Sequence, residues 1–230
     1  DYMVCESCVE QAGAIVARDF SEFQSLMLLA ETLNKKIING NRIAGLSGAG
    51  FETVGMADSI YSDDYKMEFA TFNESTNELI SSIVKDKNLD TFITLSNPID
   101  INPSADDGTH LLIAEAILMD PCVDALVMSL DPMSPSTKTL NFKEHCYKEF
   151  SVKDESKTKE NLESSTKKDN ENPYDMNQKD SIKDLIISLA ERCNKPIITV
   201  VDGGRLYDPL REAMLKYGVP VFTTCDRAVA

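Results

Sequence analysis

Short apolar runs alternate with helical patterns along most of this chain, and that alternation restricts its fold more than any other feature. The apolar runs are bounded by Gly, Pro, Asn or Asp, so they predict buried strands. The predicted strands lie at 43–46, 66–72, 92–95, 123–130, 196–201 and 219–222. A strand, a helix and a further strand form a right-handed unit whose strands run parallel. The sequence therefore predicts an α/β fold, a parallel sheet with helices on both faces.

Helical periodicity fills the segments between these runs. The predicted helices cover 1–18, 19–33, 52–58, 73–83, 110–119, 182–189 and 206–217. We assign Ser21 as the N-cap of the second of these helices, because a serine hydroxyl accepts a bond from the first helical turn. The residues from Asp100 to Pro103 are expected to be extended, since a residue that precedes proline avoids the helical region.

The turn Ser47–Gly50 joins the strand at 43–46 to a helix that starts near Glu52. The first turn of a helix has unpaired N–H groups and a positive dipole end, and glycine lets an oxygen approach the backbone closely. The turn lacks the Lys-Ser/Thr ending of a P-loop and the third glycine of a dinucleotide fingerprint. Two interpretations therefore stay open, an anion site or an ordinary small-residue turn. Glu52 would compete with a phosphate here, so we treat it as structural.

Polar residues follow the other predicted strands as well. These stretches are Asn97–Asp100, Ser129–Pro132, Asp202–Gly204 and Thr223–Asp226. Because the carboxyl ends of parallel strands share one rim, we expect the stretches to converge on one crevice, although βα turns use the same residue types for loop geometry alone. The candidate rim residues are Asn97, Asp100, Asp202, Gly203 and Gly204.

No catalytic residue is assigned within the chain. Asp100 and Asp202 have the chemistry of general acids or bases, but neither has a paired acid or nucleophile near it in the sequence. His110 would suit catalysis or phosphorylation, and the competing interpretation, a surface histidine on a helix, is favoured. His145 has a weaker case.

Charge and cysteine usage exclude several classes of protein. A formal net charge of −15 argues against a nucleic-acid partner, which needs a basic face, and no apolar run is long enough to cross a membrane. Cys5 and Cys8 have C-x-x-C spacing, but no second pair completes a zinc site, so we expect two buried thiols and no metal. Scattered cysteines of this kind are typical of a reducing compartment, which predicts a cytoplasmic protein.

Composition divides the chain into three kinds of segment. Residues 1–39 form helical patterns and a polar linker, and residues 40–230 carry the alternating strands and helices. Within the latter, residues 141–179 are mostly Lys, Asp, Glu, Asn, Ser and Thr, which bury too little surface to offset the cost of ordering, so we expect a disordered insertion. The chain opens at Asp1 without an initiator Met or a signal-like segment, and we expect it to be a piece of a longer protein.

The order of several short motifs resembles that of one family. The motifs are Gly40–Glu52, Gly55–Asp58, Asn97–Ile101, Asp120–Val127, Lys195-Pro196, Gly203-Gly204 and Arg227–Val229. Together they are similar to the ADP-forming (NDP-forming) acyl-CoA synthetases, also called ADP-forming acetate–CoA ligases, which are relatives of succinyl-CoA synthetase. Each motif is short, but the ordered set spans nearly the whole chain apart from the insertion.

The resemblance implies a fold, a reaction and partners. It implies that residues 40–230 form a flavodoxin-like domain of the succinyl-CoA synthetase type, and that residues 1–39 are the helical tail of a preceding histidine-loop domain. The reaction converts acetyl-CoA, ADP and phosphate to acetate, CoA and ATP through an acyl phosphate and a phosphohistidine that lies upstream of Asp1. The expected partners are a CoA-binding domain, the histidine-loop domain and an ATP-grasp module, fused or separate, in an oligomer. The full enzyme is expected to use CoA, ADP or ATP, phosphate and Mg, with none bound by this part alone, which is inactive by itself.

The resemblance also gives the glycine turn a role. In this family two helix N-termini face the phosphohistidine, and one of them matches Ser47, Gly48, Ala49, Gly50 and Phe51, the expected phosphate-binding residues. Many relatives have Asn-Ala-Gly-Gly at this place, so Ser-Gly-Ala-Gly departs in detail. Two other hypotheses stay open: a non-catalytic relative that binds or senses acyl-CoA, and an unrelated flavodoxin-like module for a flavin or a nucleotide.

Overall fold

The computed structural model describes residues 1–60, 66–89, 93, 95–141 and 174–230, and a single parallel sheet forms its centre. The three long strands are β1 (Arg42–Ser47), β4 (Ala125–Leu130) and β5 (Ile197–Val201). The two-residue strands are β2 (Glu68–Phe69), β3 (Ile99–Asp100) and β6 (Val221–Phe222). Their order is β2-β1-β4-β5-β6, β3 also pairs with β1, and every pair is parallel, so the predicted sheet is confirmed.

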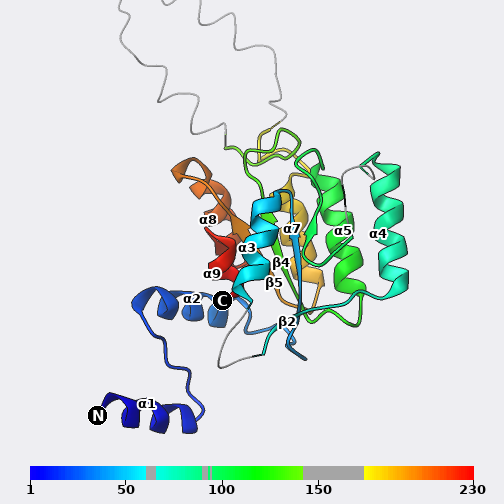
Figure 1. The fold of residues 1–230 in the computed structure, drawn as a ribbon. Coiled ribbons are helices and arrows are strands. Elements are labelled where there is room, and N and C mark those ends of the chain that lie inside the picture. The colour runs from blue at the N-terminus through cyan, green and yellow to red at the C-terminus, as the bar shows by residue number, and fades with distance from the viewer. Residues whose placement is uncertain (61–65, 90–92, 94, 142–173) are drawn as a thin grey trace, which may run out of the picture.

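Helices cover both faces of this sheet, as Figure 1 shows. One face carries α4 (Glu74–Asp86), α5 (Asp107–Met119), α7 (Ile182–Arg192) and α8 (Asp208–Lys216), the last preceded by the 3-10 turn η2 (Arg205–Tyr207). The other face carries α3 (Gly50–Ser59) and the short α9 (Cys225–Val229). The α/β architecture predicted from the alternation is the one observed.

Successive residues of β1 point to opposite faces of the sheet. Ala44 and Leu46 pack in the larger core, beneath α4, α5 and α7, whereas Ile43 packs in the smaller core beneath α3. Because both faces are covered, β1 needs an apolar or small residue at each of its buried positions, 43–47, which explains its continuous apolar run. In the same register Ser47 lies opposite Ser129 of β4, so the carboxyl ends of these strands lie at one rim.

Asn97 holds β1 to the neighbouring edge of the sheet. Its side-chain Nδ2 donates to the carbonyl oxygens of Ile43 at 3.0 Å and Ala70 at 2.9 Å, and its Oδ1 accepts from Gly45 N at 2.8 Å. A Cβ on Gly45 would stand only 2.7 Å from Pro98 Cβ, so this close approach requires glycine. The side-chain amide of Asn97 therefore makes hydrogen bonds with β1 that a neighbouring strand would otherwise make.

The structure corrects the prediction for the chain after β3. Asn102 has φ +66, so the stretch that precedes Pro103 is not extended throughout. Its Oδ1 accepts from Ser104 N at 3.0 Å, and this local turn, which asparagine favours, outweighs the preference of a residue that precedes proline. Residues 92 and 94 of the strand predicted at 92–95, and most of the insertion predicted at 141–179, lie outside the described residues. Ile93 and Leu95 are described and belong to no strand.

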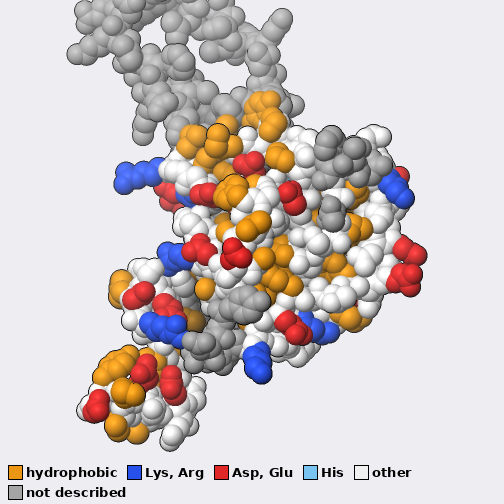
Figure 2. Space-filling model, in the orientation of Figure 1, with side chains coloured by type: hydrophobic (Ala, Val, Ile, Leu, Met, Phe, Trp, Pro, Cys, Tyr) orange, Lys and Arg blue, Asp and Glu red, His pale blue; other side chains and the backbone are white. Residues whose placement is uncertain are grey.

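The first helix, α1 (Tyr2–Gln11), lies apart from the body of the molecule (Figures 1 and 2). It has no buried residue, and its apolar side chains are visible as a cluster on its surface in Figure 2. The prediction that Cys5 and Cys8 are buried is therefore wrong, because no described element covers them and both are exposed. None of the helices in the described ranges has both the length and the apolar character needed to span a bilayer.

The second helix, α2 (Phe20–Thr32), contacts the C-terminal end of the domain. The Arg227 guanidinium donates to Ser21 O at 3.1 Å and to Ser25 Oγ at 3.0 Å. Its N-cap is Asp19 and not Ser21 as predicted, since Asp19 Oδ1 accepts from Glu22 N at 2.8 Å. Both residues are suitable caps, and the aspartate two positions earlier takes the role.

Candidate functional site

The turn between β1 and α3 lies at the carboxyl rim and leaves backbone donors open. Gly48 is buried, whereas Gly50 and Phe51 are exposed, Phe51 to 69%. No side chain caps α3 at Ala49, and among the described residues no acceptor is present for the N–H groups of Gly50 and Phe51. Ser47 Oγ accepts a hydrogen bond from the backbone N–H of Ala49 at 3.0 Å. The turn therefore presents two N–H groups at the positive end of a helix dipole.

Glu52 lies beneath this turn and points into the protein. It is 2% exposed, and its carboxylate accepts from Ser47 Oγ at 2.5 Å. Burial raises the pKa of Glu52, and the nearby carboxylates of Asp202 and Asp131 raise it further, while Ser129 and Ser47 favour the charged form. Ser129 Oγ is buried near this carboxylate but makes no hydrogen bond of good geometry with a described residue. Glu52 is thus an inward-facing group that leaves the outside of the turn free.

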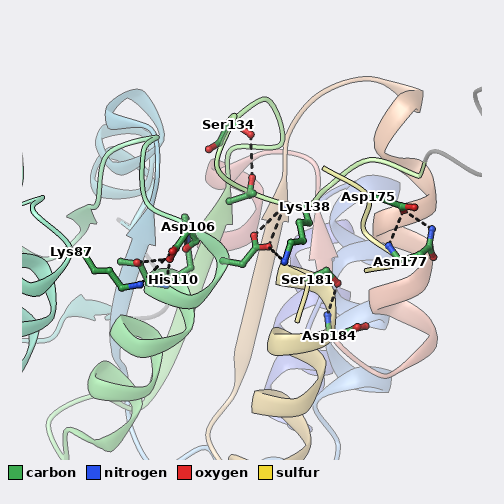
Figure 3. A network of polar contacts seen from close by, with 12 residues as sticks. Lys87, Asp106, His110, Ser134, Lys138, Asp175, Asn177, Ser181 and Asp184 are labelled. Carbon is green, nitrogen blue, oxygen red and sulfur yellow. Dashed lines mark hydrogen bonds and ion pairs between the residues drawn. The ribbon is translucent and has the colours of Figure 1, made fainter. Parts of the chain in front are cut away.

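His110 approaches the same turn from the opposite face of the sheet. It is 2% exposed on the first turns of α5, so the expectation of a surface histidine is wrong. Its Nδ1 lies 3.0 Å from Asp106 O, and its Nε2 stands 3.7 Å from the place that a Cβ on Gly48 would occupy. Figure 3 shows His110 with Asp106 and Lys87 at the N-terminal end of α5. Burial lowers the pKa of His110, and the Asp106 carbonyl and the charges of Asp106 and Asp131 oppose that shift.

Carboxylates surround the open end of the turn. Asp100 Oδ2 would lie 2.9 Å from a Cβ on Gly50, and Asp131 Cβ would lie 3.8 Å from a Cβ on Gly48. Among the described residues, Asp100, Asp131, Asp202 and Glu52 form no ion pair with a lysine or an arginine. An anion that binds here therefore meets favourable N–H groups and an unfavourable local field.

The turn after β5 is closed by its own side chains. Arg211 is buried, and its guanidinium donates to Val201 O at 3.0 Å and to Gly203 O at 2.6 Å. Gly203 has φ +104, a conformation that suits glycine, and lies against the Tyr207 ring. The arrangement fixes the position of Asp202 at the rim.

The sequence and the fold are similar to those of known synthetases. No family model matches the sequence. The alpha subunit of acetate–CoA ligase (ADP-forming) II from Pyrococcus furiosus is 29% identical over 126 residues, which cover 55% of this chain and 25% of that protein. The sequence of this chain is therefore similar to that of an ADP-forming acetate–CoA ligase subunit.

Solved structures with this fold include two archaeal proteins. PH0766 from Pyrococcus horikoshii OT3 matches with a TM-score of 0.69 and 19% identity, over 99% of this chain and 42% of that one. The dinucleotide-forming acetyl-coenzyme A synthetase 1 of Ca. Korarchaeum cryptofilum, in complex with phosphate and ADP, matches with a TM-score of 0.67 and 20% identity, over 100% and 39%. The chain therefore spans about two fifths of the length of these solved structures.

The carboxyl rim of the sheet contains most, but not all, of the residues predicted for it. Asp100 and Asp202 lie near the turn, as the strand ends suggested, while Gly203 and Gly204 serve as carbonyl partners of Arg211. Asn97 instead bonds within the sheet and faces β1. The carboxyl ends of the strands therefore lie at one rim, as predicted. Whether a given side chain faces the turn depends on the hydrogen bonds that it makes nearby.

His110, Ser129 and Asp131 lie at the rim but were not among the candidate rim residues named from the sequence. A signal for His110 was present, because Ile113, Ala114 and Ile117 follow it at helical spacing and all are fully buried. That pattern puts the histidine on the buried face of its helix. Ser129 and Asp131 fall within the stretch Ser129–Pro132 that the strand ends placed at this rim, although neither was named as a candidate residue.

The described residues contain no cluster of metal-ligating side chains. No group of three or more His, Cys, Asp or Glu among them has the arrangement that could hold a metal ion.

Proposed function

We propose that this chain is part of an ADP-forming acyl-CoA synthetase and forms one wall of the place where a phosphoryl group docks. The observation that carries the proposal is the pair of open N–H groups of Gly50 and Phe51, at the rim where open α/β sheets bind ligands. A phosphoryl group carries about −1.5 to −2 charge at neutral pH and accepts several hydrogen bonds. Both properties match the N-terminal end of α3.

The proposed reaction is that of the whole enzyme. Acetyl-CoA, ADP and phosphate give acetate, CoA and ATP through an acyl phosphate and a phosphohistidine. In this proposal residues 1–39 are the tail of the histidine-loop domain and residues 40–230 are a flavodoxin-like domain. The CoA-binding domain, the phosphohistidine and the ATP-grasp module with its Mg belong to other parts of the enzyme, fused or separate, in an oligomer. That one curated relative is named a subunit supports such a division.

The four carboxylates near the turn set a condition on docking. A dianion that came alone would be repelled by Asp100, Asp131, Asp202 and Glu52, none of which a described cation neutralises. Free phosphate should therefore bind this turn weakly but measurably through the open N–H groups. Positive charge from the module that carries the phosphoryl group would strengthen its docking beyond that of a free anion.

Removal of a single N–H tests the docking role. Gly50→Pro removes one donor and keeps the helix, because proline suits the first helical position and Ala49 is already extended. Phosphate binding to the chain, measured by 31P NMR, is expected to weaken about tenfold or more, since a hydrogen bond to a charged group is worth about 1.5–3 kcal/mol. In the complete enzyme the same variant should lower phosphate-dependent ATP formation.

Gly50→Ala is the matched control for this variant. It adds the same carbon beside Asp100 but keeps the N–H group, so it separates crowding from the lost donor. We expect Gly50→Ala to bind phosphate more tightly than Gly50→Pro. Equal affinities for the two variants would contradict the role of the Gly50 N–H.

A non-catalytic, regulatory relative of the synthetases is the second candidate. The unpaired carboxylates at the rim favour it, because they weaken the case for a phosphoryl group as the natural ligand. This candidate predicts a complete protein that shows no phosphate-dependent formation of ATP from acetyl-CoA and ADP.

A further inference from the structure

The His110 side chain is buried, and no described residue forms a hydrogen bond with its second ring nitrogen, Nε2. Its Nδ1 lies 3.0 Å from the Asp106 carbonyl oxygen, which can only accept, so Nδ1 carries the proton. Nε2 of the neutral ring is then an acceptor, and no described residue donates a hydrogen bond to it. The His110 side chain is 2% exposed, so a nitrogen without a described partner at this place is available to a ligand that reaches the turn.

Nε2 is directed at the glycine turn of the proposed docking site. It stands 3.7 Å from the position of a Cβ on Gly48, beside Asp131 Cβ at 3.8 Å and Asn102 O at 4.0 Å. Since Gly48 has no side chain, nothing of that residue fills the space between the imidazole and the turn. His110 thus meets from the α5 side the same turn whose N–H groups open on the α3 side.

We infer that His110 is a second anion contact of this turn, and that it takes up a proton from solvent when a phosphoryl group docks and then donates an Nε2–H bond to that group. The inference rests on the proposed docking function. No covalent bond forms or breaks, and the proton returns to solvent when the group leaves. One positive charge would appear where the rim otherwise holds only carboxylates.

The charged groups around His110 fit this assignment. On its own helix Asp106 faces it and is paired with Lys87 of the segment after α4 at 3.4 Å, and Asp131 faces it from the loop after β4. Asp107, one position after the cap of α5, is engaged with Lys138. Lys87 and Lys138 are thus paired with carboxylates of their own. The neutral His110 ring can therefore take up a proton when an anion arrives.

Sulfate is the probe that isolates this response, because its charge stays constant between pH 5 and 8 while that of phosphate changes. The pKa of free His110 is below its ordinary value and should rise on sulfate binding. Sulfate affinity is then highest below the free pKa and falls as the pH rises towards the bound pKa, by about tenfold for each unit of the shift. Calorimetric titration of the chain with sodium sulfate across this range measures the effect.

Three variants make the test specific. His110→Gln supplies a donor that does not titrate, so its sulfate affinity should be independent of pH. Gly48→Ala places a methyl group 3.7 Å from Nε2 without a clash and so blocks the approach of an anion to that nitrogen. It should therefore also reduce the pH dependence of sulfate affinity. His145→Gln removes the other of the two histidines and should behave as the wild type, and it leaves one imidazole signal for NMR.

The outcomes separate the two proposals. A wild-type profile that His110→Gln flattens, with a His110 pKa that sulfate raises, supports the inference. Sulfate binding with the same pH dependence in the wild type and in His110→Gln would overturn it while leaving the docking site intact. Absence of both sulfate and phosphate binding at any pH would overturn the docking function and this inference with it.

Discussion

The turns after β1 and β5 have equivalent places in the fold but use their backbones in opposite ways. Each joins a buried parallel strand to a helix at the carboxyl rim. After β5, Arg211 occupies the carbonyl oxygens of Val201, Gly203 and Gly204. After β1, the N–H groups of Gly50 and Phe51 are left without acceptors. A strand–turn–helix unit offers a ligand site only where the chain has not used its polar groups itself.

The largest expected effect is the loss of the Arg211 contacts. Arg211→Met leaves the buried carbonyl oxygen of Val201 and the carbonyl oxygen of Gly203 without this donor, and the free energy of unfolding should fall by about 3 kcal/mol. Urea denaturation measures this change. Arg205→Met, at an exposed position in the same loop, is the control and should have little effect. Similar stabilities for the two variants would show that Arg211 does not hold the turn.

The same substitution in both turns should have unequal effects. Gly203→Ala forces alanine into φ +104 and against the Tyr207 ring, which should cost about 1–2 kcal/mol of unfolding free energy. Gly48→Ala meets its neighbours no closer than 3.7 Å and should change stability by less than about 0.5 kcal/mol. Thermal denaturation of the two proteins compares them, and equal losses would mean that the β1 turn is also closely packed.

The smallest effect is a pH dependence confined to the β1 turn. Burial raises the folded-state pKa of Glu52, so its contribution to stability is full below the ordinary value of 4.5 and is lost as the pH rises through the raised pKa. Glu52→Gln keeps an acceptor for Ser47 and removes that loss. From pH 4 to 7 the free energy of unfolding of the wild type should fall relative to that of the variant. Parallel pH profiles would contradict the burial of a charged Glu52.

The layers of the fold could be predicted from sequence because they follow from local patterns. The continuous apolar runs of β1, β4 and β5 predicted the three long strands. The glycine turn was found for the same reason.

Features that depend on packing were missed. Cys5 and Cys8 lie on a helical apolar pattern, which does not reveal whether anything covers it. Arg211 binds carbonyl groups up to ten positions away in the chain, and a charged residue in a helix gives no sign of such burial. His110 was judged as a single residue, whereas its apolar neighbours at helical spacing marked the buried face.

The hydrogen bonds of the Asn97 side chain limit which residues can replace it at this edge of the sheet. Its two N–H bonds reach carbonyl groups of two different segments, and its oxygen receives the N–H of Gly45. A carboxylate differs from it by one atom but has no hydrogens to give, and would set its charge against two carbonyl oxygens. The alignment of β1 with its neighbours is therefore held by the identity of a single nitrogen atom.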